Sequence, residues 1–225
     1  MPTPFRILAV LLAAGPFPLP AQDPPPKGQN VALATTGLAG QPVAVLPLTM
    51  IMADRRVPGV AGTAARATLA RWADSLLGDL LTERATEVNW ILPPRLRLAA
   101  ARAAGMMPSP DQMGQAVLRA PNLKEVPDPL RAHLRQLLTL AGGARFAFIP
   151  AALALAPAGA AGDSLQVSLS AVLADGRLGR VVWRTVAVGV GETADEAYRA
   201  ALSTLFLPDS GGEEDGRTAG PQGGR

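Results

Sequence analysis

Residues 165–189, which read LQVSLSAVLADGRLGRVVWRTVAVG, decide the fold class of this chain. Apolar and polar residues alternate over Leu165–Leu173, which is typical of a half-buried strand. A turn is expected over Ala174–Arg177, because Gly176 can supply the positive φ that hairpin turns demand. The apolar stretch Gly179–Gly189 then returns as the paired strand. The segment therefore predicts an antiparallel hairpin.

Upstream of this hairpin, two stretches predict a buried strand and a long helix. The apolar run Pro42–Met52 is rich in β-branched residues, and Pro47 places it at a sheet edge or at a change of direction. From Ala64 to Ala85, leucines recur at helical spacing and charged residues largely take the other side. This is the strongest amphipathic helix in the sequence.

The remaining periodic segments complete a mixed pattern. We expect a strand over Glu87–Leu92, helices over Pro93–Ala104, Pro110–Leu118 and Pro127–Ala141, a strand over Phe146–Leu155, and a final helix from Ala194 to Leu205 that Thr193 caps. The fold class is α+β: a single mixed sheet with a C-terminal antiparallel meander, packed against helices on one or both faces.

The two ends of the chain have a different composition from the middle. Residues 1–21 have a positive start, a short apolar run and a small residue before a polar segment, which is typical of a signal peptide cleaved after Ala21. Residues 22–41 are rich in proline and glycine and are expected to form a linker. Residues 42–207 form the single expected domain, and 208–225 are expected to be a disordered tail. The mature protein is thus expected to be periplasmic or secreted.

Composition excludes several kinds of chemistry. The 225 residues include no cysteine and one histidine, so disulfide scaffolds, thiol nucleophiles and His-rich or Cys-based metal centres are excluded. We expect no cofactor. The sequence pI near 10.1 rests on only three more basic than acidic residues, 21 against 18. This is far from the dense basic face of a nucleic-acid-binding protein, so no nucleic-acid partner is expected.

Few residues could support catalysis. His133 has no second histidine or orienting carboxylate nearby in the sequence and is interpreted as structural. The run Gly189–Gly191 before a helix lacks the third glycine and the lysine of a phosphate-binding loop. The carboxylates of the long helix and its end follow its polar face and are interpreted as solvated; they are Asp74, Asp79, Glu83 and Glu87.

One cluster of basic residues has an aromatic neighbour. Trp90 precedes Arg95, Arg97 and Arg102, which together could bind an acidic patch of a partner. The alternative interpretation is that these arginines lie on the solvated side of their helix. Trp90, Arg95 and Arg97 are the candidate binding residues.

Three short motifs resemble those of a group of bacterial envelope domains. They are Val43-Ala-Val-Leu-Pro47, Trp90-Ile-Leu-Pro93 and Ala174-Asp-Gly-Arg-Leu-Gly-Arg-Val-Val-Trp183. The group includes the periplasmic domain of curli-secretion-channel proteins, the amino-terminal domain of the translocation protein TolB, and penicillin-binding-protein activator lipoproteins. The resemblance covers most of residues 42–207 and implies no catalytic residues. The chain lacks both a cysteine for lipidation and the membrane-inserting hairpins of a channel.

The first hypothesis for function is a non-enzymatic periplasmic domain that binds an envelope protein through an exposed sheet edge or the region of Trp90 and Arg95. A carboxylate-based glycan hydrolase is the second, and it requires two carboxylates across one cleft, for example with Asp54, Asp163 or Asp175. The third is a structural subunit of an envelope assembly, for which an exposed apolar patch would be evidence.

Overall fold

The computed structural model describes residues 32–57, 59–60, 62–159 and 163–206. The expected signal peptide at 1–21 and tail at 208–225 lie outside these residues, as does the first half of the expected linker. The described part of that linker, residues 32–41, packs onto the domain through buried Leu33 and Leu38 and forms a short 3-10 helix, η1 (Thr35–Leu38). The folded unit therefore includes residues before Pro42, because two leucines there reach the main core.

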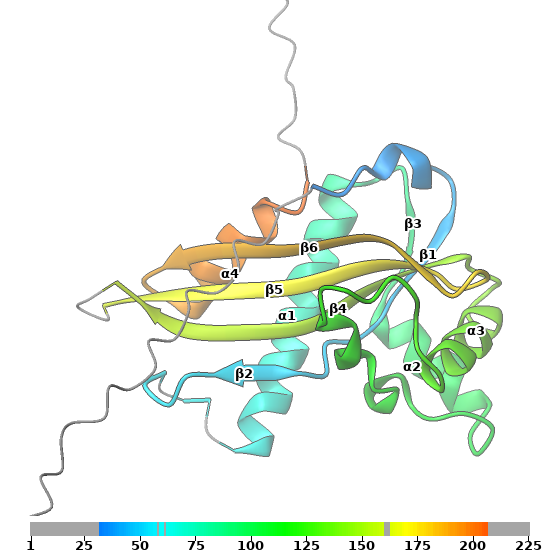
Figure 1. Cartoon of the computed structure of the whole chain (residues 1–225), viewed down its shortest axis with the longest axis horizontal. Helices are drawn as coiled ribbons and strands as arrows, with labels where there is room; N and C mark the ends of the chain where they lie inside the picture. Colours follow the sequence, from blue (N-terminus) through cyan, green and yellow to red (C-terminus); the bar gives the residue numbers. More distant parts are fainter. Residues whose placement is uncertain (1–31, 58, 61, 160–162, 207–225) are drawn as a thin grey trace, which may run out of the picture.

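The fold is α+β with one mixed six-stranded sheet, as the sequence predicts (Figure 1). The strands are β1 (Pro42–Val45), β2 (Ile51–Ala53), β3 (Asn89–Ile91), β4 (Phe146–Ala158), β5 (Ser164–Asp175) and β6 (Arg180–Gly191). Their order is β3-β1-β4-β5-β6, and β2 also pairs with β4, beyond the end of β1. The β1–β3, β1–β4 and β2–β4 pairs are parallel, whereas β4, β5 and β6 form the expected antiparallel meander.

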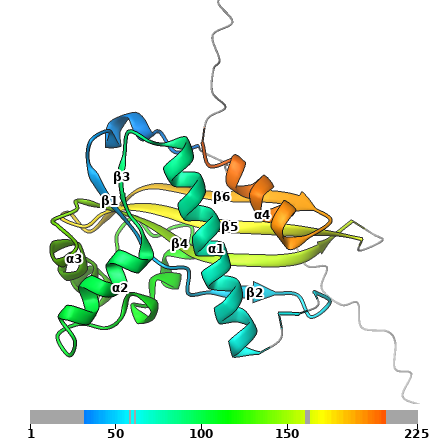
Figure 2. The same ribbon diagram turned by 180° about the vertical axis from the view of Figure 1, so that it is seen from behind.

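The helices cover both faces of the sheet. On one face lie α1 (Thr63–Arg84) and α4 (Ala194–Ser203), which Figure 2 shows in front of the strands. On the other lie α2 (Pro93–Arg102), α3 (Leu130–Leu140) and two 3-10 turns, η2 (Pro110–Gln112) and η3 (Gln115–Arg119). The sequence predicts one α-helix over Pro110–Leu118. The structure has two 3-10 turns there, separated by Gly114 in the left-handed conformation.

The opening strand is broken where the sequence predicts one continuous strand. Residues 46–50 separate β1 from β2, opposite an irregularity in β4 between Pro150 and Ala152. Pro47 and Pro150 have no backbone N–H, so this part of the ladder lacks two donors. The Leu48 N–H points elsewhere and donates to the carboxylate of Asp74 at 2.7 Å. The break therefore explains why an acidic side chain lies inside the protein.

The hairpin turn is formed as expected, but its glycine has another role. Gly176 does not adopt a positive φ; Gly179 does, at 69°. A Cβ at Gly176 would lie 2.2 Å from Cδ1 of Leu138, so that side chain would have to shift to admit a larger residue. The turn is held by Asp175, whose Oδ1 accepts the N–H groups of Arg177 and Leu178 at 2.9 Å each. Tertiary packing, rather than backbone conformation, thus favours glycine at position 176.

Candidate functional site

The short strand β3 forms one edge of the described sheet. It pairs with β1 alone, and the N–H of Asn89 donates to the carbonyl of Gln41 at 3.1 Å. Alternate residues of a strand point to opposite faces, so Trp90 and Ile91 belong to different cores. Helices from both layers therefore border the surface around this edge.

Helix α2 supplies the side chains that border this edge. Its first turn contains Pro93 and Pro94, where proline needs no hydrogen-bond donor, and Leu96 and Ala100 are buried beneath it. Residues at i, i+3 and i+7 share one side of a helix. Three residues with this spacing line the outward side of α2; they are Arg95, Leu98 and Arg102.

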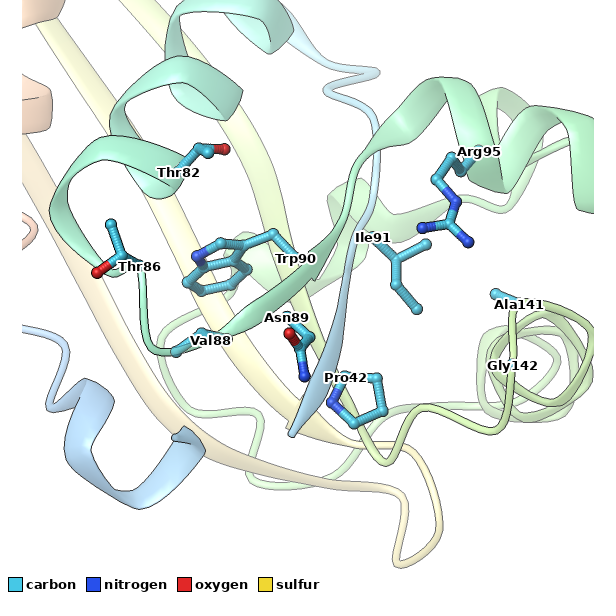
Figure 3. Close-up of a pocket in the computed structure, with 10 residues that line it drawn as sticks. All are labelled: Pro42, Thr82, Thr86, Val88, Asn89, Trp90, Ile91, Arg95, Ala141 and Gly142. Carbon is cyan, nitrogen blue, oxygen red and sulfur yellow. The ribbon is translucent and has the colours of Figure 1, made fainter. Parts of the chain in front are cut away.

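Two adjoining hollows surround the β3 edge. The larger has a volume of about 550 Å³ and is lined by β3, Thr82 and Thr86 at the end of α1, Arg95, and the end of α3 (Figure 3). The smaller, of about 310 Å³, shares Ile91 and Arg95 and continues between α2 and α3. We call both hollows together the β3 surface. Figure 3 shows Arg95 and Ile91 on the side of Ala141 and Gly142, with Trp90 on the opposite side of the strand.

The β3 surface combines apolar and cationic groups. Leu98 is 62% exposed and Leu140 is 44% exposed, although both are large aliphatic side chains. Within the described residues, neither Arg95 nor Arg102 forms an ion pair. The sequence analysis missed Leu98 and Leu140. A signal for Leu98 is present in the sequence. It lies three residues after Arg95 on the same helix, so the two side chains are neighbours on its surface, whereas Leu96 is on the buried side.

Trp90 lines the larger hollow, but it also supports the fold. Its ring packs edge-on against Phe148, with ring centres 6.4 Å apart, and its Nε1–H donates to the carbonyl of Ala85 at 3.0 Å. Trp90 is only partly buried and belongs to the edge of the main core. Its substitution would therefore affect both the core and the β3 surface.

The structure separates Arg97 from the other candidate residues. Its guanidinium points away from β3 and forms a bidentate ion pair with Asp111, with Nε to Oδ2 at 2.9 Å and Nη2 to Oδ1 at 2.8 Å. It also donates to Oδ2 of Asp74 at 3.3 Å. Trp90 and Arg95 thus border one hollow, whereas Arg97 lines another, between α1 and residues 48–51.

Asp74 is buried, which corrects its interpretation as part of the solvated side of α1. It is 8% exposed. Burial raises the pKa of Asp74 to about 6, although the Leu48 N–H and Arg97 both favour the carboxylate. The hydrogen bond from Arg97 lowers the pKa of Asp111 and outweighs its partial burial. This cluster was not predictable from local sequence patterns, because Asp111 and Asp74 lie 14 and 23 residues from Arg97.

The carboxylate arrangement bears directly on the hydrolase hypothesis. Asp74 and Asp111 line the same hollow, but both accept hydrogen bonds from Arg97, which lies between them. Asp54 pairs with Arg56 on the surface, and Asp175 is engaged by Arg145 and the turn it holds. A glycosidase needs one carboxyl group to protonate the leaving oxygen and another to act on the sugar. The carboxylates named here are instead held by arginines.

The opposite edge of the sheet carries exposed valines. On β6, Val182, Val188 and Val190 are exposed, while the start of the strand bonds with the segment before α3, where the Val181 N–H donates to the Lys124 carbonyl at 2.9 Å. Exposed apolar edge strands favour association with another chain. This edge is the feature that the structural-subunit hypothesis would use.

Two further observations concern metals and membranes. The described residues contain no group of three or more His, Cys, Asp or Glu side chains that could hold a metal ion. Among the same residues, no helix combines the length and the apolar character that crossing a membrane requires.

The comparisons with known proteins gave structural similarities only. No protein-family model and no curated protein matches the sequence. The LpoB C-terminal domain from Salmonella enterica is 12% identical, with 67% of this chain and 82% of that chain covered and a TM-score of 0.34. Lipoprotein GNA1162 from Neisseria meningitidis is 16% identical, with coverages of 65% and 78% and a TM-score of 0.32. The PelC dodecamer from Paraburkholderia phytofirmans is also 16% identical, with coverages of 78% and 87% and a TM-score of 0.33. Two of these weak similarities, to LpoB and to lipoprotein GNA1162, are consistent with the envelope group named from the sequence motifs.

Proposed function

We propose that this protein is a non-enzymatic interaction domain of the bacterial cell envelope that binds a partner protein through the β3 surface. The observation that carries this proposal is the exposure of Leu98 and Leu140 beside two arginines, Arg95 and Arg102, that lack a carboxylate partner within the described chain. Large aliphatic groups exposed beside unpaired guanidinium groups are typical of binding surfaces.

The partner surface is expected to be acidic with an apolar centre. Arginine forms bidentate hydrogen bonds with carboxylates, and such pairs gain strength when an interface excludes water. Leu98 lies between Arg95 and Arg102 in the sequence of α2, so an aliphatic or aromatic side chain of the partner would contact it while flanking carboxylates meet the arginines. Binding should therefore weaken as salt concentration rises.

The proposed location rests on the first residues. Residues 1–21 have the composition of a signal peptide, and cleavage near Ala21 would place the domain in the periplasm or outside the cell. The sequence resemblance to envelope domains supports the same location. The exposed edge of β6 gives the structural-subunit alternative a specific surface, while the two carboxylates that share a hollow, Asp74 and Asp111, are both bound by Arg97.

The experiment compares two double variants of the chain from Gln22. Arg95→Ala with Leu98→Asp changes the β3 surface, whereas Arg180→Ala with Leu178→Asp makes the same changes at the β5–β6 hairpin, which lines neither hollow of the β3 surface and where Leu178 is 61% exposed. Each is crosslinked to cell envelopes, retained proteins are identified by mass spectrometry, and the affinity for the purified candidate is then measured. Trp90 is left unchanged because it belongs to the core.

The proposal expects one envelope protein whose affinity falls at least about tenfold with the β3 variant and is unchanged with the hairpin variant. Equal binding by both variants would overturn the assignment to the β3 surface. Release of glycan fragments by the unmodified chain, lost on Asp74→Asn, would instead support the hydrolase.

A further inference from the structure

Strand β2 leaves a second edge of the sheet open. Within the part of the chain that the structure describes, β3 pairs with β1, and β2 pairs only with β4. The Leu153 N–H donates to the Met50 carbonyl, and the Asp54 N–H donates to the Leu155 carbonyl, each at 2.9 Å. In a parallel ladder alternate residues bond to the neighbouring strand, so Met52 bonds toward β4. The N–H and C=O groups of Ile51 and Ala53 therefore point away from the sheet.

Helix α1 borders this open edge. Its N-terminal half continues past β2, as both ribbon views show (Figures 1 and 2). Between this half of α1 and residues 48–51 lies a hollow of about 660 Å³, which we call the β2 groove. The helix lines it with small residues, Ala67 and Ala70, which leave room beside the strand. Adjacent strands lie about 4.8 Å apart, so a strand added to β2 would run along this groove.

The charges of the groove favour an acidic occupant. Its ionised lining residues are three arginines and two aspartates. Both aspartates are bonded to Arg97, which closes one end of the groove. Arg66 and Arg71 of α1 are exposed and have no carboxylate partner within the described residues. The groove therefore has two cationic groups available for a ligand.

We propose that the β2 groove binds an extended acidic peptide segment of a partner protein as an additional β-strand. The peptide backbone forms hydrogen bonds with the outward-pointing N–H and C=O groups of Ile51. The carboxylates of the peptide form ion pairs with Arg66 and Arg71. Strand addition of this kind takes affinity from main-chain hydrogen bonds and selectivity from alternate side chains. The groove is a site separate from the β3 surface, because the two share none of their lining residues.

The first test measures charge selectivity. A short fluorescein-labelled peptide of alternating valine and glutamate is titrated with the full mature chain, and a peptide with lysine in place of glutamate is the control probe. Arg66→Glu with Arg71→Glu should weaken binding of the glutamate peptide by about tenfold or more. The matched pair Arg177→Glu with Arg180→Glu, exposed near the hairpin turn, should leave it unchanged. Equal affinity for both peptides would overturn the proposal.

The second test reports on strand formation. In amide hydrogen exchange followed by NMR, the Ile51 and Ala53 amides should exchange fast in the unbound chain and become protected by the glutamate peptide. The Met52 amide, directed at β4, should be protected in both states. Binding without protection of Ile51 and Ala53 would rule out strand addition. Protection before any peptide is added, lost on deletion of residues 207–225, would assign the groove to the chain's own acidic tail instead of a partner.

Discussion

The buried carboxylate of Asp74 should make the stability of the protein depend on pH in an unusual direction. Most native carboxylates have lowered pKa values, so acid destabilises the fold. For Asp74, burial raises the pKa from 3.8 to about 6. The folded state therefore binds this proton more tightly than the unfolded state does, and the contribution of Asp74 to stability is fully present only below the unfolded pKa of 3.8 and is lost as pH rises through about 6.

The size of the effect follows from the pKa change. A difference of one unit corresponds to 1.36 kcal/mol, so the rise at Asp74 is worth about 3 kcal/mol at pH 8. Asp74→Asn removes the charge but keeps an oxygen that can accept the Leu48 N–H, which Asp74 Oδ1 accepts at 2.7 Å. The variant should therefore gain stability relative to the unmodified protein as pH rises, by about 3 kcal/mol between pH 3 and pH 8.

Urea unfolding followed by tryptophan fluorescence measures this difference at each pH. Trp72 is a suitable reporter because its ring centre lies 5.4 Å from that of Tyr198, in the core beside Asp74. Asp79→Asn is the control variant, because it removes one negative charge from an exposed position of the same helix. A stability difference that stays constant with pH, or that turns against Asp74→Asn as pH rises, would refute the reasoning.

Two other substitutions test the packing of the sheet. Gly189→Ala should lower the unfolding free energy by about 3 kcal/mol, because its Cβ would lie 2.2 Å from backbone atoms of Ala197 and Ala201 in α4. Thermal unfolding measures this loss, and Gly37→Ala is the control because a Cβ at Gly37 would meet open space. Asp175→Ala should cost about 1 to 3 kcal/mol, because it leaves two turn N–H groups without their acceptor, while the half-exposed Arg145 regains water. Urea unfolding that showed a loss below about 1 kcal/mol would contradict the role of that carboxylate in holding the turn.

Elements that depend on neighbouring residues could be predicted from the sequence. The alternation over Leu165–Leu173 predicted a strand within β5 because side chains of a strand alternate between two environments. The Thr193 cap of α4 was predicted for a similar reason, and its side chain accepts the Glu196 N–H at 3.2 Å. At the site, the closeness of Trp90 and Arg95 follows from the short strand-to-helix connection between them.

Features that depend on distant residues could not be predicted in this way. The break between β1 and β2 lies opposite the irregularity in β4, about a hundred residues further along the chain, and it directs the Leu48 N–H to Asp74. The amphipathic pattern of α1 placed Asp74 on its polar side, whereas the structure buries it. Such a pattern does not show which distant segments pack against the polar side of a helix. Arg97 was grouped with Arg95 by sequence distance, whereas its partners come from α1 and η2.

The sequence by itself determined the general order of the elements and the antiparallel meander, since each follows from periodicity within a few residues. Only the tertiary structure decided which polar groups are buried, that residues 32–41 pack on the core, and that β2 is left with an open edge. The physical reason is that burial and strand pairing join segments far apart in the chain. The free energies of burial and of strand pairing depend on contacts between those segments, so the local pattern of one segment cannot predict them.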